Sequence, residues 1–270
     1  MRLVIKFSMV SLAVVLAAPA LALQARAQDA KPIVQQAVTA ELAANRDDQS
    51  HWRYLRSEAG GNSLIIVETE HGAISRHVQE NGRPASAKAL AEDDAHIQKF
   101  IHDPAMQQKQ RQNGEHDDKS AVELMNLLPQ AFLWSVVSET PEAMTLSFRP
   151  DPNFHPPDME ARVMGEMSGT LIVDRAQHRI RTMKGRLESD VTIGFGLLAR
   201  IKQGSTFDVE RRQVAPGYWE ITETHVHISG HALFFKTIGQ QEDEVKSDFT
   251  LVPLGTTLDQ AVGLLKGAAR

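Results

Sequence analysis

The chain of 270 residues contains no cysteine, and this absence excludes several kinds of protein at once. Without a thiol there is no cysteine nucleophile, no disulfide framework and no lipid-attachment cysteine behind a signal sequence. The sequence also lacks the G-x-S-x-G elbow, the H-E-x-x-H helix, the Walker phosphate loop and the G-x-G-x-x-G fingerprint. We therefore expect a protein that is not an enzyme and that binds no cofactor or metal.

Positive charge is also in short supply. The chain has 29 Lys and Arg residues against 34 Asp and Glu residues. Arg2, Lys6 and Arg26 precede the expected cleavage site described below, so 26 basic residues remain and the net charge becomes −8. Proteins that bind nucleic acids are usually basic, with clustered Lys and Arg. We therefore expect no nucleic-acid partner.

Residues 1–27 have the pattern of a cleavable signal peptide. A basic start precedes an apolar run from Phe7 to Leu23, and Ala25-Arg26-Ala27 is a small-x-small cleavage site. The run is broken by Pro19, and a membrane anchor would need about 20 apolar residues. We expect a periplasmic protein that is cleaved near Ala27. Residues 28–270 contain no further segment that is apolar enough to span a membrane.

Helical patterns occur in three parts of the chain. An apolar stripe at helical spacing predicts a first helix, which ends at Asn45–Asp48. A mostly polar segment at about 85–129 is also expected to be helical. Within it the capping box Ser120–Glu123 predicts a separate short helix that Pro129 stops. A second capping box, Thr257–Gln260, predicts the start of the last helix.

Short strands separated by Gly, Asp or Pro fill most of the remaining chain. The expected strands are His51–Ser57, Ser63–Thr69, Ala73–Gln79, Ala131–Val137, Met144–Phe148, Gly169–Val173, Arg179–Leu187, Val191–Leu198, Ser205–Val214, Gly217–Val226, His231–Ile238 and Lys246–Val252. Regular short strands predict a curled antiparallel sheet or barrel. The fold class is therefore α+β: a large curved antiparallel sheet, an incomplete β-barrel, with helices covering one side.

Several strand motifs follow one another in the second half of the chain. They are Gly169-Thr170-Leu171-Ile172-Val173-Asp174, Arg179-Ile180, Gly185-Arg186-Leu187, Gly217-Tyr218-Trp219 and Gly230-His231-Ala232-Leu233-Phe234-Phe235-Lys236. This series resembles the strands of the LolA-like superfamily of outer-membrane lipoprotein-sorting and carrier proteins. The resemblance covers roughly Phe148 to Phe249. It implies a single domain over residues 28–270, built as a half-barrel with a helical lid.

The function that this resemblance implies is transport in the cell envelope. Such a protein is a periplasmic carrier that holds a lipid or a lipoprotein acyl chain in its apolar cavity, without covalent chemistry. Its partners are a lipid or an acylated protein. The large apolar side chains of the expected strands are candidates for the cavity wall, although they could equally fill a closed core. These candidate ligand-binding residues are Phe132, Trp134, Phe195, Leu197, Leu198, Phe234, Phe235 and Phe249.

Two other functions stay open. The same fold with a filled core could be an envelope scaffold or stress-sensing module that binds protein partners. His225 and His227 share a face of their strand with Glu223, as metal ligands can, so a metal-dependent hydrolase is conceivable. His231 would be the third histidine ligand, but Gly230 is expected to turn the chain before it.

Charged residues near the expected strand ends offer weaker candidates. Asp158 and Glu160 could form an acid–base pair in a Pro-rich loop, although the composition of the loop predicts that it is exposed to solvent. Basic residues at a cavity mouth could contact a phosphate or carboxylate, although solvated strand ends explain them equally. These basic residues are Lys184, Arg186, Arg200 and Lys202.

Overall fold

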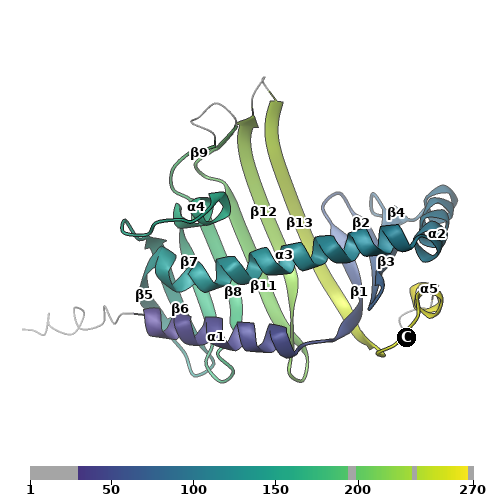
Figure 1. Cartoon of the computed structure of the whole chain (residues 1–270), viewed down its shortest axis with the longest axis horizontal. Coiled ribbons are helices and arrows are strands. Elements are labelled where there is room, and N and C mark those ends of the chain that lie inside the picture. Colours follow the sequence, from purple (N-terminus) through teal and green to yellow (C-terminus); the bar gives the residue numbers. More distant parts are fainter. Residues whose placement is uncertain (1–29, 194–198, 233–235, 267–270) are drawn as a thin grey trace, which may run out of the picture.

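The computed structural model describes residues 30–193, 199–232 and 236–266. Over these ranges thirteen strands form one antiparallel sheet that does not close, and five helices accompany it (Figure 1). The predicted α+β class and the large antiparallel sheet are therefore confirmed. The strands are β1 (His51–Glu58), β2 (Asn62–Thr69), β3 (Gly72–Glu80), β4 (Arg83–Pro84), β5 (Phe132–Glu139), β6 (Ala143–Pro150), β7 (Met167–Asp174), β8 (Ile180–Leu187), β9 (Val191–Ile193), β10 (Ala199–Ile201), β11 (Thr206–Ala215), β12 (Tyr218–Ala232) and β13 (Lys236–Val252).

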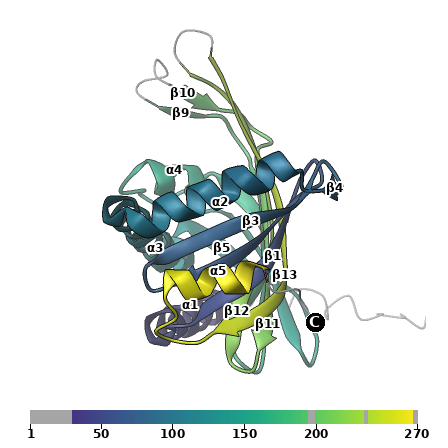
Figure 2. The ribbon, with the colours of Figure 1, turned by 90° about the vertical axis from the view of Figure 1, so that its right-hand side faces the viewer.

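The order of the strands places the first strand beside the last one. The sheet runs β4-β3-β2-β1-β13-β12-β11-β8-β7-β6-β5, and β10 joins it by pairing with β12 and β9. Because β1 pairs with β13, the N-terminal hairpins continue the sheet that the second half of the chain builds. Strands β12 and β13 have 15 and 17 residues, and they extend past their neighbours (Figures 1 and 2).

The helices are α1 (Lys31–Asp47), α2 (Ala87–His102), α3 (Pro104–Ala131), α4 (Met159–Gly165) and α5 (Leu258–Lys266). Helices α1 and α3 cross one face of the sheet, which we call the inner face (Figure 1). Helices α2 and α5 pack against β2 and β3 (Figure 2). The predicted capping box of α5 is confirmed, since Thr257 and Gln260 exchange side-chain and backbone hydrogen bonds of 2.8 and 3.3 Å. No helix in the described ranges is both long and apolar enough to cross a bilayer.

Helix α3 is one continuous helix of 28 residues, so the prediction of a separate helix at Ser120–Glu123 is wrong. The Asp103 side chain caps its start by accepting hydrogen bonds from the backbone of Ala105 and Met106, at 3.0 and 3.1 Å. Met106 packs against one core cluster and Leu128 lies in another. Residues 108–119 between these anchors are exposed. The polar middle needs no apolar stripe because the helix is held at both ends.

Strand β12 also passes through a predicted break. Gly230 was expected to turn the chain, but it lies inside β12 and pairs with Ile201 and Ile238. A Cβ atom at this position would lie 2.4 Å from the Arg200 carbonyl oxygen. The glycine permits a close backbone approach within the sheet and does not form a turn.

A buried carboxylate attaches α1 to the inner face. Glu41 is 5% exposed and accepts a hydrogen bond of 2.6 Å from the backbone N–H of Ile180. It also pairs with Arg179 at 3.0 Å and with Arg211. Burial alone would raise the pKa of Glu41, but the two guanidinium groups and the N–H lower it below its ordinary value. The carboxylate is therefore charged and fully engaged.

Replacing Glu41 by Gln should destabilise the protein by about 3–5 kcal/mol, because the buried guanidinium group of Arg179 and the partly buried one of Arg211 lose their counter-charge. The measurement is the free energy of unfolding in urea. Glu92→Gln is the matched control, since the Lys88–Glu92 pair is solvent-exposed and loosely held at 3.8 Å. That control should change stability by no more than about 0.5 kcal/mol. Equal stability of the two variants would contradict this role of Glu41.

Candidate ligand-binding site

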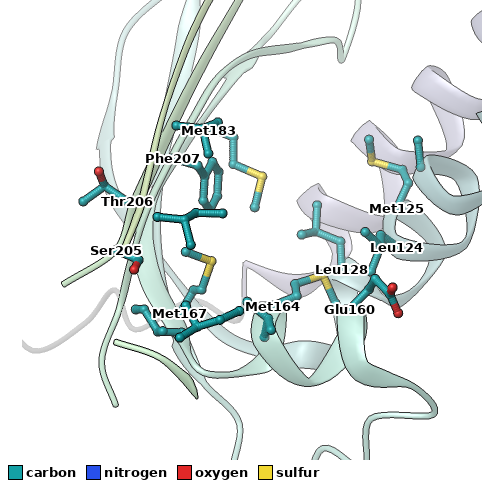
Figure 3. Close-up of a pocket in the computed structure, with 16 residues that line it drawn as sticks. Leu124, Met125, Leu128, Glu160, Met164, Met167, Met183, Ser205, Thr206 and Phe207 are labelled. Carbon is teal, nitrogen blue, oxygen red and sulfur yellow. The ribbon is translucent and has the colours of Figure 1, made fainter. Parts of the chain in front are cut away.

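A cavity of about 350 Å³ lies between the inner face of the sheet and helices α3 and α4. Figure 3 shows Met183 and Phe207 on the sheet side facing Met125 and Leu128 on the helix side, with Met164 and Met167 below. Its walls are mostly apolar, and we call it the apolar chamber. The side chains that define it are Met125, Leu128, Met164, Met167, Met183, Phe207, Val226 and Ile228.

Two glycines that lie side by side in the sheet make room for aromatic rings next to the apolar chamber. One cross-strand row runs from Phe148 through Gly169 and Gly185 to Phe207. A Cβ at Gly185 would lie 2.3 Å from the Phe207 ring, and one at Gly169 would lie 2.8 Å from the Phe148 ring. The Phe207 ring therefore lies over Gly185 and the Phe148 ring lies over Gly169, where the absence of a side chain leaves room for each ring. Gly185 thereby allows the Phe207 ring to take its place in the chamber wall.

Four methionines contribute to the wall of the apolar chamber: Met125, Met164, Met167 and Met183. They come from four different elements, α3, α4, β7 and β8. Methionine is unbranched and polarizable, so it can adapt its shape to an apolar guest more readily than a branched side chain. The wall is therefore suited to ligands whose shape is not rigidly defined, such as alkyl chains.

A second cavity of about 500 Å³ continues from the first, between α1, α3 and the sheet. The two cavities share Ala121, Met125, Met183 and Phe207 as wall residues, so they are parts of one trough. Charged side chains line the second part, which we call the polar chamber. They are Glu41, Asp48, Asp118, Arg179, Arg211 and Glu220.

The two arginines of the polar chamber are fixed by neighbours. Arg211 donates to the Trp219 carbonyl oxygen at 3.0 Å in addition to its pairing with Glu41. The Arg179 guanidinium carbon lies 5.9 Å from the centre of the Trp219 ring, a cation–π contact. Among the described atoms, the Nε of Arg179 is buried and has no hydrogen-bond partner. One donor at this end of the trough is thus unused.

Glu220 is the most perturbed carboxyl group of the polar chamber. Its burial and the negative charges of Glu68 and Asp48 raise its pKa from 4.5 to about 7. Arg211 and Lys246 act in the opposite direction but do not cancel the effect. The group therefore changes its charge close to neutral pH.

The structure places the described part of the predicted wall elsewhere. Phe132 and Trp134 are buried in a core cluster, with their rings 5.6 Å apart and edge to face. Phe249 stacks on Tyr54 at 5.3 Å near the other end of the sheet. None of these three residues lines either chamber. The other predicted wall residues, Phe195, Leu197, Leu198, Phe234 and Phe235, lie outside the described residues.

The predicted histidine pair lies on the outer face of the sheet. His225 Nδ1 and His227 Nε2 lie 2.8 and 2.9 Å from the same oxygen of Asp243. Hydrogen bonds from Gln241 and from both histidines hold the pKa of Asp243 below its usual range. The side chain of His231 lies outside the described part. Over the side chains that are described, no group of three metal-ligating residues could hold an ion.

The weaker candidates have structural roles or lie away from the trough. Asp158 caps α4 by accepting from the Ala161 N–H at 2.7 Å, and Glu160 lies at the edge of the apolar chamber. Lys184 pairs with Asp208 at 2.7 Å. It follows Met183 in the strand, so it faces outward. Arg186, Arg200 and Lys202 do not line either chamber.

Comparisons with protein-family models, with curated proteins and with solved structures found no match. Function is therefore inferred from the chambers themselves. In the trough, an apolar part continues into a part with fixed charges. Such a trough fits an amphipathic molecule.

The perturbed Glu220 makes stability depend on pH. Because its pKa is raised in the folded state, Glu220 contributes stability that is complete below pH 4.5 and is lost as the pH rises through about 7. Glu220→Gln should therefore show a smaller fall in unfolding free energy between these two pH values than the unmodified protein. Denaturant titrations across this range measure it. The control is Glu223→Gln, because the Glu223 carboxylate pairs with Arg212 at 2.9 Å on the outer face. This variant should show the same pH dependence of unfolding free energy as the unmodified protein. Parallel pH dependences for all three proteins would contradict the raised pKa of Glu220.

Proposed function

We propose that the chain is an exported, LolA-like carrier that holds a lipid or a lipoprotein acyl chain in the apolar chamber. One observation carries this proposal: an open sheet leaves about 350 Å³ of space with apolar walls beside its inner face. Ligand pockets in proteins typically measure about 300–1,000 Å³. The half-barrel with a helical cover, which the resemblance implies, is compatible with this architecture. No covalent step forms part of the proposal.

The driving force is burial of the alkyl chain. Each methylene group that leaves water gains about 0.8 kcal/mol, so ten methylenes supply about 8 kcal/mol in total. Immobilising the chain and ordering the wall side chains reduce this gain. Because the wall contains four methionines, it can close around chains of different length at little steric cost. The site thus favours apolar chains as a class.

Release of the ligand requires movement of the cover. Helix α3 supplies Leu124, Met125 and Leu128 to the chamber, and α4 supplies Val163 and Met164. The middle of α3, residues 108–119, is exposed and makes few buried contacts that would resist bending. We expect the middle of α3, between its anchors at Met106 and Leu128, to bend away from the sheet when a partner offers the ligand a better apolar site.

The cellular setting is also part of the proposal. The expected signal peptide places the mature chain in the periplasm, where lipids and acylated proteins must cross an aqueous space. A carrier with an apolar chamber shields the acyl chain from water during that passage. The lipid or acylated protein is then the cargo, and an envelope protein is the partner that accepts it.

Filling the apolar chamber should abolish binding of an acyl chain. Val226→Trp places a large ring in the chamber wall and should weaken binding of a fluorescent fatty-acid analogue at least about tenfold. The matched control is Val245→Trp on the neighbouring strand. Val245 pairs with Glu223 on the outer face and is 41% exposed, so this variant should bind normally.

Circular dichroism and urea unfolding establish that both variants are folded. Normal binding by folded Val226→Trp would show that the apolar chamber is not the site. Failure of the unmodified protein to bind any acyl probe would contradict the carrier function and favour a scaffold that binds envelope proteins.

A further inference from the structure

The polar chamber is the continuation of the apolar chamber, and its charges constrain the other end of a bound amphiphile. Ala121, Met125, Met183 and Phe207 belong to the walls of both chambers. An acyl chain in the apolar chamber therefore directs its head group past these four residues. The head group meets the charged side chains between α1, α3 and the sheet. The following inference rests on the proposed function and extends it to the class of head group.

The polar chamber carries an excess of negative charge. Its wall contains the carboxylates of Glu41, Asp48, Asp118 and Glu220 but only two guanidinium groups. Both guanidinium groups pair with Glu41. Within the described part of the chain, Glu220 makes no hydrogen bond or ion pair, although it is half-buried. A cationic group of a ligand would compensate this uncancelled charge.

A second, independent feature points to an acceptor on the same ligand. Arg179 is 9% exposed, and its Nε has no hydrogen-bond partner among the described atoms. The rest of its guanidinium group is held by Glu41 at 3.0 Å and by the Trp219 ring. A buried N–H without a partner costs free energy until an acceptor reaches it. The guanidinium group lines the polar chamber, so a phosphate or ester oxygen of a ligand would satisfy this donor once the Arg179 side chain turns toward it.

These two features together select one class of head group. An anionic head would satisfy Arg179 but would also be repelled by Glu220, Asp48 and Asp118. An uncharged head would leave the negative charge uncompensated. We propose that the polar chamber binds a zwitterionic head group, with its ammonium near Glu220 and its phosphate beside the Arg179 guanidinium group. The cargo is accordingly a phospholipid-like amphiphile that carries an amine.

Two lysophospholipids with the same acyl chain test this proposal directly, one with an ethanolamine head and one with a glycerol head. Both carry a phosphate, and they differ in the ammonium group. Isothermal titration of the mature chain should show the ethanolamine form binding at least about tenfold more tightly. In Glu220→Gln this preference should fall below about threefold. In Glu223→Gln, the outer-face control on the same strand, the preference for the ethanolamine form should remain at least about tenfold.

The pH dependence gives an independent readout. The groups that act on Glu220 are Glu68 on β2, Asp48 after α1, Arg211 on β11 and Lys246 on β13. Because the ammonium favours the ionised form of Glu220, the preference for ethanolamine should grow as the pH rises through about 7. In Glu220→Gln the preference should be independent of pH over the same range.

The Arg179 contact predicts a different pattern. Arg179→Leu removes the donor that serves both phosphates, so both probes should bind more weakly and by a similar factor. Thermal unfolding shows whether Arg179→Leu is folded. If Arg179→Leu does not fold, the head-group preference of Glu220→Gln and of its control Glu223→Gln decides the proposal. Unchanged affinity of folded Arg179→Leu for both probes would overturn the role of Arg179.

The possible failures are distinguishable. If both probes bind equally well, or the glycerol form binds more tightly, the head-group inference is wrong and the carrier function stands. If neither probe binds while the protein is folded, the proposed carrier function itself fails.

Discussion

The buried carboxylate of Glu41 is the interaction on which the rest of the site depends. It attaches α1 to the inner face through the backbone of Ile180 and through two arginines, Arg179 just before β8 and Arg211 in β11. Because α1 and α3 pack against each other, this attachment also fixes the position of the cover over the trough. The same contact orients Arg179 and Arg211, and so it determines which charges remain available inside the polar chamber.

The apolar chamber depends on a different constraint. The sheet is open, and its inner face leaves space under α3 and α4, while Gly169 and Gly185 allow the Phe148 and Phe207 rings to lie close to the strands. Helix α3 bridges this space because it is anchored near Met106 and near Leu128, in separate core clusters. The result is a trough that one helix spans, with methionines where its walls meet. Flexible apolar walls and fixed charges at one end are the features on which the proposed binding of an amphiphile rests.

The sequence predicted the strands and helices better than it predicted the residues of the site. Alternation and turn residues located most strands, and the capping box at Thr257–Gln260 located the last helix, because these are local signals. The capping box at Ser120–Glu123 wrongly predicted the start of a separate helix, because the packing of both ends of α3 overrides a local start signal. Gly230 wrongly predicted a turn, because glycine occurs at close backbone approaches within a sheet as well as in turns.

The site residues could not be predicted because they converge from distant parts of the chain. Glu41 lies more than a hundred residues before Arg179 and Arg211 in the sequence, and no local pattern links it to them. Large aromatic residues were the natural candidates for a wall, yet Phe132 and Trp134 pack in the core. The useful signals were the glycines Gly169 and Gly185, which the strand motifs contained. Their cross-strand neighbours became visible only with the register of the sheet.

Native mass spectrometry of residues 28–270, purified from the periplasm of cells that produce the full chain, tests the central claim most directly. Organic extraction of the same sample identifies whatever is bound. A carrier should retain one lipid or acyl species in stoichiometric amount, and that species should dissociate when the protein unfolds. A mass equal to that of the bare chain, unchanged after incubation with lipids, would contradict a lipid-binding trough between α3 and the sheet.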